Sequence, residues 1–140
     1  MKQLLAAAVI VGILSLTGCS ATRNPEAERA AVAAAEAWLR LVDAGDYEAS
    51  WKASSAFFRN AVTREQWEKS MRTFRTPLGG NLSRRIKSRR YRTSLPGAPD
   101  GQYVIIRFKS SFAQKKSAVE TVTPMLEENG VWHVSGYYIK

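Results

Sequence analysis

The chain has 140 residues, of which 45% are apolar, and its 21 Lys and Arg outnumber its 12 Asp and Glu, which gives a formal net charge of +9. This composition is typical of one folded domain and excludes a disordered or collagen-like chain. The single cysteine excludes a disulfide framework and a cysteine-based zinc site, and the single histidine leaves too few ligands for a histidine-built metal centre. We therefore expect neither a metal nor a cofactor.

The N-terminus has the pattern of a secretory signal peptide. A short basic start precedes an apolar run over residues 4–16, and small residues follow it up to Cys19. As a helix, the apolar run of 13 residues spans about 20 Å, which is short of the hydrocarbon core of a membrane at about 30 Å. We predict a signal peptide over residues 1–18, a short tether over residues 19–24 and one α+β domain over residues 25–140.

Leu16-Thr17-Gly18-Cys19 resembles the lipobox of bacterial lipoproteins. In that class the thiol carries a diacylglycerol, the signal peptide is cleaved before the cysteine, and the new amine receives an acyl chain such as palmitate. The resemblance implies lipidation at Cys19, with the N-terminal lipid holding the protein to a membrane. Ser20 rather than Asp follows the cysteine, which implies sorting to the outer membrane, facing the periplasm. The alternative is an ordinary secreted protein with a chance cysteine at its cleavage site.

The first helix is predicted from residue 25 to the Ala44-Gly45 pair. Asn24 suits the N-cap and Pro25 the first helical position. Apolar residues recur on one stripe of this segment, which has the length of about five turns.

Two further helices are predicted before residue 80. Asp46 caps a short helix that continues irregularly through Phe58, and Thr63-Arg64-Glu65-Gln66 is a capping box for a helix that ends near Phe74. The predicted buried side of this last helix consists of Trp67, Met71 and Phe74.

From residue 81 onward the hydrophobic period changes to two, which indicates strands. The predicted strands cover residues 82–95, 102–112, 117–127 and 131–139. Three helices followed by four antiparallel strands indicate an α+β domain with the helices on one face of the sheet.

Asn129-Gly130 predicts a two-residue type I′ turn between the last two strands. This turn pairs Met125 with Val134 and Thr121 with Tyr138.

The same register divides the last strand pair between two faces. The face predicted to meet the core carries Trp132, Val134, Gly136 and Tyr138. Glu120 and His133 fall on the other face. Pro124 lacks an N–H donor, so it predicts a bulge or break at this point of the strand pair.

The chain resembles the bacterial domain-of-unknown-function family number 4019. The segments that carry the resemblance are residues 37–39, 43–47, 50–51, 63–67, 95–103, 120–122 and 130–139. That family is similar to the nuclear-transport-factor-two-like, or cystatin-like, superfold, so the resemblance implies helices that close over a curved sheet to form a cone. The chain departs from the family at Pro124 and in its denser basic run before Tyr91.

The positive charge is concentrated in residues 59–92, which hold 11 basic and two acidic residues. Within the first strand the alternation of faces must slip near residues 88 to 90, as a bulge allows. The predicted anion-binding strip on the outward side then consists of Arg85, Lys87, Arg89, Arg90 and Arg92. The alternative is a solvated strand whose charges prevent edge pairing. Export from the cell argues against a nucleic-acid partner, although its binding would use the same electrostatics.

Aromatic residues suggest a pocket for an apolar small ligand. The predicted lining consists of Arg84, Trp51, Trp67, Trp132 and Tyr138. The alternative is that the aromatic residues are plain core.

Acid–base groups are few. The candidates are His133, Glu120 and Asp100, and none has a nucleophile or metal beside it in the predicted arrangement. Glu120 is expected to pair across strands with Arg107 or Lys109. Together these patterns predict a non-enzymatic envelope lipoprotein whose basic strip faces an anionic envelope surface or partner. The alternative is a small hydrolase or isomerase that uses the cone as its active site.

Overall fold

The helices begin at the caps that the sequence provides. In the computed structural model, which describes residues 22–140, α1 (Pro25–Asp43) follows Asn24, whose side chain accepts a hydrogen bond from the amide of Ala27. α4 (Arg64–Phe74) begins with both hydrogen bonds of the capping box between Thr63 and Gln66. The starts predicted for these two helices are therefore confirmed. The predicted signal peptide and Cys19 lie outside the described residues.

The irregular second helix is two short helices, α2 (Tyr47–Lys52) and α3 (Ala56–Ala61), capped by Asp46 and Ser55. The helix is interrupted between α2 and α3 because the Ser55 amide donates to the Val134 carbonyl of β4, at 2.8 Å, and not to a carbonyl of the preceding helical turn. Over residues 22–140 the structure thus has four α-helices, where three were expected, and a 3-10 helix, η1 (Thr76–Leu78).

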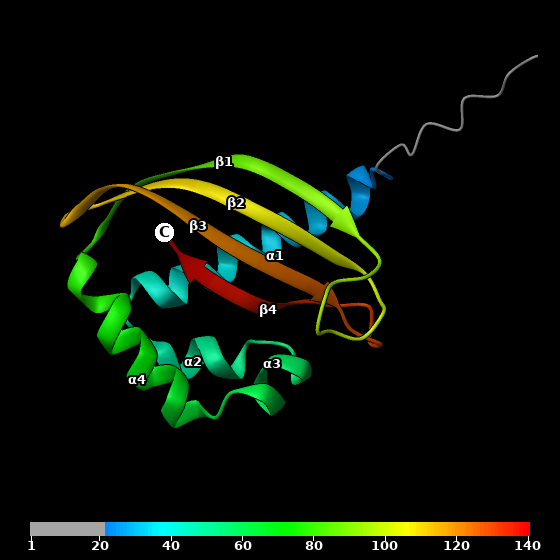
Figure 1. The fold of residues 1–140 in the computed structure, drawn as a ribbon, viewed down its shortest axis with the longest axis horizontal. Helices are drawn as coiled ribbons and strands as arrows, with labels where there is room; N and C mark the ends of the chain where they lie inside the picture. The colour runs from blue at the N-terminus through cyan, green and yellow to red at the C-terminus, as the bar shows by residue number, and fades with distance from the viewer. Residues whose placement is uncertain (1–21) are drawn as a thin grey trace, which may run out of the picture.

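The strands β1 (Asn81–Arg92), β2 (Tyr103–Phe112), β3 (Lys115–Leu126) and β4 (Trp132–Ile139) form one antiparallel sheet in chain order. Figure 1 shows the curved sheet with α1 behind it and the shorter helices below. α1 contacts all four strands. We call the sheet face that packs against α1 the inner face and the opposite one the outer face. The predicted α+β class and antiparallel sheet are confirmed.

The core lies between α1 and the inner face. Its buried residues on α1 recur at helical spacing, and those on the strands alternate with exposed ones, as an amphipathic helix on a half-buried sheet requires. The largest core side chains include Trp38, Leu39, Ile106, Phe108 and Val122.

β1 contains the slip in alternation that its sequence predicts. Ile86 pairs with Phe108 and Ser88 with Arg107, so Lys87 is an extra residue that forms a bulge. The bulge lies one residue before the predicted stretch.

This bulge changes the orientation predicted for Arg89. Arg89 pairs with the core residue Ile106, so it lies on the inner face. There its Nε lies 3.5 Å from Glu28 Oε2 of α1. The prediction that Arg89 points outward with the rest of the strip is therefore wrong.

The turn between β3 and β4 has one residue more than predicted. The Glu127 amide donates to Val131 O at 3.0 Å, and the Gly130 amide donates to Glu127 O at 2.9 Å. Gly130 has a φ of 77°, whereas Asn129 has no positive φ. A type I′ turn needs positive φ at both central residues, so the predicted two-residue turn is wrong. Met125 consequently pairs with His133 rather than with Val134.

A bulge in β4 offsets this difference. Val122 pairs with Tyr137 and Pro124 with Val134, so Ser135 and Gly136 together oppose a single residue of β3. This irregularity lies where Pro124 predicts one.

Beyond the bulge, the side chains of β4 lie on the opposite face from the one predicted. Val134 and Tyr137 lie on the inner face, whereas Tyr138, predicted to face the core, is 48% exposed. Because Thr121 pairs with Tyr138 on the outer face, Glu120 lies on the inner face. The prediction that Glu120 points outward is wrong.

Candidate functional site

Glu120 is the centre of a buried polar network on the inner face. Its side chain has no exposed surface. It accepts hydrogen bonds from Ser110 Oγ at 2.6 Å, Arg84 Nε at 2.7 Å and Tyr137 OH at 2.5 Å. The donors belong to β2, β1 and β4, so the network joins all four strands. This carboxylate is therefore held by inner-face groups rather than by Arg107 or Lys109, its expected partners.

Arg84 extends the network to α1. Its two terminal nitrogens donate to the Asp43 carboxylate at 2.7 and 2.9 Å, which is a two-bond ion pair. Arg75, at the end of α4, donates to Asp43 Oδ1 at 3.2 Å and to Gly79 O at 2.6 Å. Two guanidinium groups therefore balance the carboxylates of Asp43 and Glu120, as burial of charges requires.

The charges in the network shift its titration. Burial alone would raise the pKa of Asp43, but the hydrogen bonds and charges of Arg84 and Arg75 hold it below its usual value. Burial, followed by the Glu120 carboxylate, raises the pKa of Tyr137. At neutral pH Asp43 is therefore charged and Tyr137 is a neutral donor. Both carboxylates and the Tyr137 hydroxyl already have partners, so the network is suited to joining α1, α4 and the sheet.

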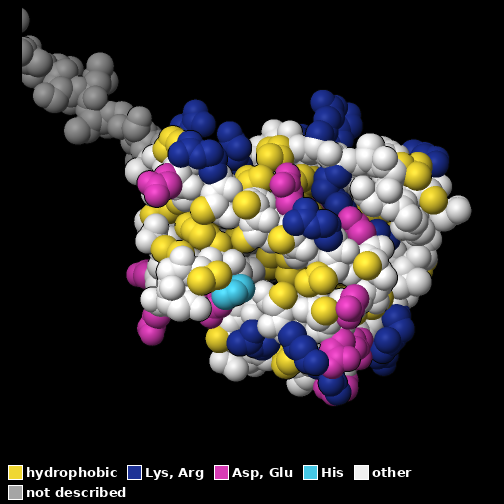
Figure 2. All heavy atoms as spheres, turned by 180° about the vertical axis from the view of Figure 1, so that it is seen from behind, with side chains coloured by type: hydrophobic (Ala, Val, Ile, Leu, Met, Phe, Trp, Pro, Cys, Tyr) yellow, Lys and Arg dark blue, Asp and Glu magenta, His cyan; other side chains and the backbone are white. Residues whose placement is uncertain are grey.

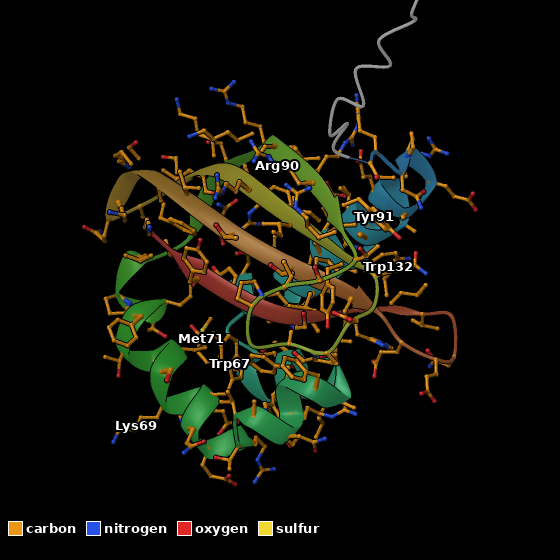
Figure 3. All side chains as sticks on the ribbon, turned by 45° about the vertical axis from the view of Figure 1, so that its right-hand side comes forward. Trp67, Lys69, Met71, Arg90, Tyr91 and Trp132 are labelled. Carbon is orange, nitrogen blue, oxygen red and sulfur yellow. The ribbon has the colours of Figure 1, made fainter. Side chains whose placement is uncertain are left out.

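A cavity of about 440 Å³ opens beside the network. It lies between α4, η1, the start of β3 and the end of β4, and we call it the α4–β4 pocket. Its apolar walls include Trp67, Met71, Phe74, Leu78 and Ile139. Figure 3 shows Trp67 and Met71 on the side of α4 that faces β4, while Lys69 points away.

The polar part of the α4–β4 pocket is basic. Arg75, Lys115 and Lys140 line it, and no acidic residue of the described chain does. Arg75 and Tyr137 belong to both the pocket and the buried network. Phe74, which was predicted to be buried, is 72% exposed and lies beside the pocket.

The outer face of the sheet carries cations from neighbouring strands. We call Arg85, Lys87, Arg90, Arg107 and Lys109 the outer basic face. Arg85 lies directly opposite Lys109, and like charges in that position destabilise a strand pair. This pairing does not stabilise the contact between β1 and β2, although cations on the edge strand β1 also prevent edge pairing with another chain.

A depression of about 470 Å³ lies within the outer basic face. Arg85 and Lys87 of β1, Lys109 of β2 and residues 117–119 of β3 line it, without any acidic residue of the described chain. Glu120 is the only acidic residue among the strands of residues 22–140, and it lies on the inner face. The depression therefore has the electrostatics of an anion site.

The predicted strip is only partly on this surface. Arg85, Lys87 and Arg90 are exposed, and Arg92 is half-buried, with a hydrogen bond from its terminal nitrogen to Tyr91 O at 2.8 Å. Arg107 and Lys109 were predicted only as partners for Glu120. Because they alternate with core residues along β2, the sequence pattern could have predicted that they lie on the same outer face.

The residues predicted to line a single pocket lie in separate places. Arg84 binds carboxylates, and Trp51 donates from Nε1 to Val62 O at 2.8 Å. Trp67 and Tyr138 line the α4–β4 pocket. Trp132 lines a shallow apolar groove of about 190 Å³ between α1 and β4. Figure 2 shows hydrophobic side chains gathered around a hollow in the middle of the face seen from behind.

The candidate acid–base groups are also apart. Glu120 pairs with Ile139 of β4. His133 lies six positions before Ile139 on the same strand, which corresponds to a distance of about 20 Å. His133 Nδ1 contacts Glu127 Oε1 at 2.5 Å, and Asp100 lies in the loop between β1 and β2. Within residues 22–140, no group of three or more His, Cys, Asp or Glu is arranged to hold a metal ion. No helix of that part of the chain has the length and hydropathy of a membrane span.

Comparison with known proteins gives a family. No curated protein matches the chain. The profile of the family described as "Protein of unknown function (DUF4019)" matches residues 34–137, which contain the second half of α1, the other helices and almost all of the sheet. Because this match covers well over half of the chain, the protein belongs to the DUF4019 family.

Proposed function

We propose that the chain is a non-enzymatic envelope lipoprotein whose outer basic face binds an anionic surface or partner. The observation that carries the proposal is the convergence of Arg85, Lys87 and Lys109 on one depression that no acidic residue of the described part of the chain lines. Each Lys or Arg near an anionic leaflet contributes about 1 kcal/mol to binding at low salt. Screening over about 8 Å at physiological ionic strength reduces that contribution.

The position of the N-terminus supports a membrane as the anionic surface. Glu28 lies 3.7 Å from Arg23 and 3.5 Å from Arg89, so the start of α1 lies beside the end of β1, as Figure 1 also shows. A lipid on Cys19 would be joined to α1 by residues 20–24, which span at most about 18 Å. The tether would therefore hold β1 close to the bilayer, where confinement strengthens weak contacts. A lipid plus basic residues is a two-signal membrane anchor.

The interior supports a binding role more than an enzymatic one. We propose that the curved sheet and helices form a cone that is filled by side chains. The rings of Trp38, Trp67 and Tyr137 pack with centroids 5.1 to 6.4 Å apart, and Phe58 packs at 5.1 Å from Trp67. A hydrolase or isomerase would need an acid or base free to meet a substrate. Glu120 instead accepts bonds on both of its oxygens.

The test uses residues 20–140 without lipid, mixed with anionic or zwitterionic vesicles at low and high salt. The outer-face variant changes Arg85, Lys87, Arg90 and Lys109 to Gln. The control variant removes the same charge from the helices, at Arg29, Arg40, Lys69 and Arg72. We expect the wild type and the control to sediment with anionic vesicles at low salt and the outer-face variant to stay in solution. Equal losses in both variants would mean that net charge alone drives binding, and the proposal would be wrong.

A further inference from the structure

The α4–β4 pocket combines apolar walls with a basic rim. Trp67, Met71 and Leu78 offer apolar surface, while Lys115 and Lys140 are placed at the same cavity. Its volume of about 440 Å³ lies within the range of small-molecule sites, about 300–1,000 Å³. A ligand that fits both parts has an apolar body and a negative head.

Arg75 supplies a second, independent observation. Its side chain is 4% exposed, and its guanidinium lies 4.5 Å from the centre of the Phe112 ring. Two of its nitrogens bind Gly79 and Asp43, but its buried Nε has no hydrogen-bond partner in the described chain. Buried donors are almost always satisfied, so the guanidinium of this lining residue retains one N–H for which the described chain provides no acceptor.

Exposed aromatic residues that line the pocket also indicate a binding site. Phe74 is 72% exposed and Tyr138 is 48% exposed, and both line the pocket. Adjacent exposed apolar side chains are unfavourable in water and often mark a binding site. An alkyl chain lying against Phe74 would remove this surface from water.

We propose that the α4–β4 pocket binds a free single-chain amphiphile with one negative charge, of the fatty-acid class. The carboxylate lies near Arg75 and Lys115, and the chain lies along the apolar walls between α4 and β4. The pocket shares no lining residue with the depression in the outer basic face, so separate variants can test the two sites. The inference therefore does not rest on the proposed membrane contact.

The test compares ligands with one chain length and three head groups, all below their micelle concentrations. Calorimetry measures the binding of decanoate, decyl glucoside and decyltrimethylammonium to residues 20–140. We expect decanoate to bind about tenfold more tightly than either of the others, because charged hydrogen bonds contribute more than neutral ones. Equal affinities for the three would show a merely apolar groove and overturn the proposal.

Matched variants locate the site. Lys115→Gln and Phe74→Ala should each weaken decanoate binding several-fold. Their controls, Lys69→Gln and Leu82→Ala, remove an exposed cation and an exposed apolar side chain that lie outside the pocket. Phe74→Ala alters an exposed side chain, so folding is expected to survive. Controls that weaken binding as much as the pocket variants would overturn the proposal.

A last arm separates this site from the outer basic face. The outer-face variant should bind decanoate as the wild type does, and Lys115→Gln should bind anionic vesicles as the wild type does. If the outer-face variant loses decanoate binding, the amphiphile binds the outer face and the pocket is not its site.

Discussion

Arg84 of β1 reaches across β2 to Glu120 of β3, with 2.7 Å between Nε and Oε1, and the intervening strand contributes Ser110 to the same carboxylate. The contact joins strands that are not neighbours in the sheet. It also connects the sheet to α1, because Arg84 binds Asp43. The inner face is therefore held together by ionic bonds and by aromatic packing, and Tyr137 takes part in both.

Replacing Glu120 with Ala should strongly destabilise the domain. The change leaves Arg84 with one carboxylate and removes the acceptor of Ser110 and Tyr137. Removing one partner of a buried ion pair costs about 3–5 kcal/mol, a large share of the roughly 5–15 kcal/mol that stabilises a domain. Urea unfolding measures the loss, with Glu128→Ala, an exposed carboxylate, as control. Similar unfolding midpoints for the two variants would contradict this role.

Asp43 should stabilise the domain at neutral pH and lose this effect in acid. Its folded-state pKa is lowered below the unfolded value of about 3.9, so its stabilisation is present above that value and disappears as pH falls through the folded pKa. The difference in melting temperature between the wild type and Asp43→Asn should be largest near neutral pH and should shrink below pH about 4. A difference that stays constant down to strong acid would argue against the ion pair.

Tyr137 should stabilise the domain at neutral pH and lose this effect as the pH rises into the alkaline range. Its folded-state pKa is raised, so its stabilisation is complete below the unfolded pKa of about 10 and falls as pH rises above it. We expect Tyr137→Phe to flatten the loss of melting temperature above pH about 10. Tyr138→Phe serves as control, because the pKa of that exposed phenol is lowered, first by its hydrogen bond with Thr121. An unchanged alkaline slope in Tyr137→Phe would place its hydroxyl outside the network.

Arg89 and Arg90 are adjacent in sequence, but their substitutions should differ in their effect on binding to anionic vesicles. Arg89 faces Glu28 of α1, whereas Arg90 pairs with Ile105 on the outer face. We expect Arg90→Gln to weaken binding to anionic vesicles by about 1 kcal/mol. Arg89→Gln should leave vesicle binding nearly unchanged and lower stability, because it removes a charge partner from the buried Glu28 carboxylate. Equal effects on vesicle binding would mean that both arginines reach the anionic surface.

Cys19 should carry the lipid. In cells, Cys19→Ala should abolish labelling with radioactive palmitate and should leave an unprocessed precursor, which is larger on a gel. Ser20→Ala is the neighbouring control and should be labelled normally. Labelling and membrane partition that survive Cys19→Ala would exclude lipidation at this residue.

Much of the candidate surface could be predicted from the sequence. The charge of residues 59–92 and the need for a slip in β1 place Arg85, Lys87 and Arg90 outward, and Arg84 inward. The position of Glu120 could not be predicted in the same way. Its orientation depends on the three-residue turn and on the bulge in β4. Their effects on register cancel, so Thr121 pairs with Tyr138 as predicted, but the bulge reverses the side of the sheet on which this pair lies.

By itself, the sequence determined the α+β class, the antiparallel strands and the starts of α1 and α4, because caps and hydrophobic periodicity act within a few residues of the chain. Only the tertiary structure decided which of two adjacent side chains faces the helices, Tyr137 or Tyr138 in β4 and Arg89 or Arg90 in β1. A strand reverses its faces at a single extra residue, and the position of that residue depends on hydrogen bonds to the neighbouring strand. The buried network and the α4–β4 pocket, which combine residues from distant parts of the chain, depend on those choices.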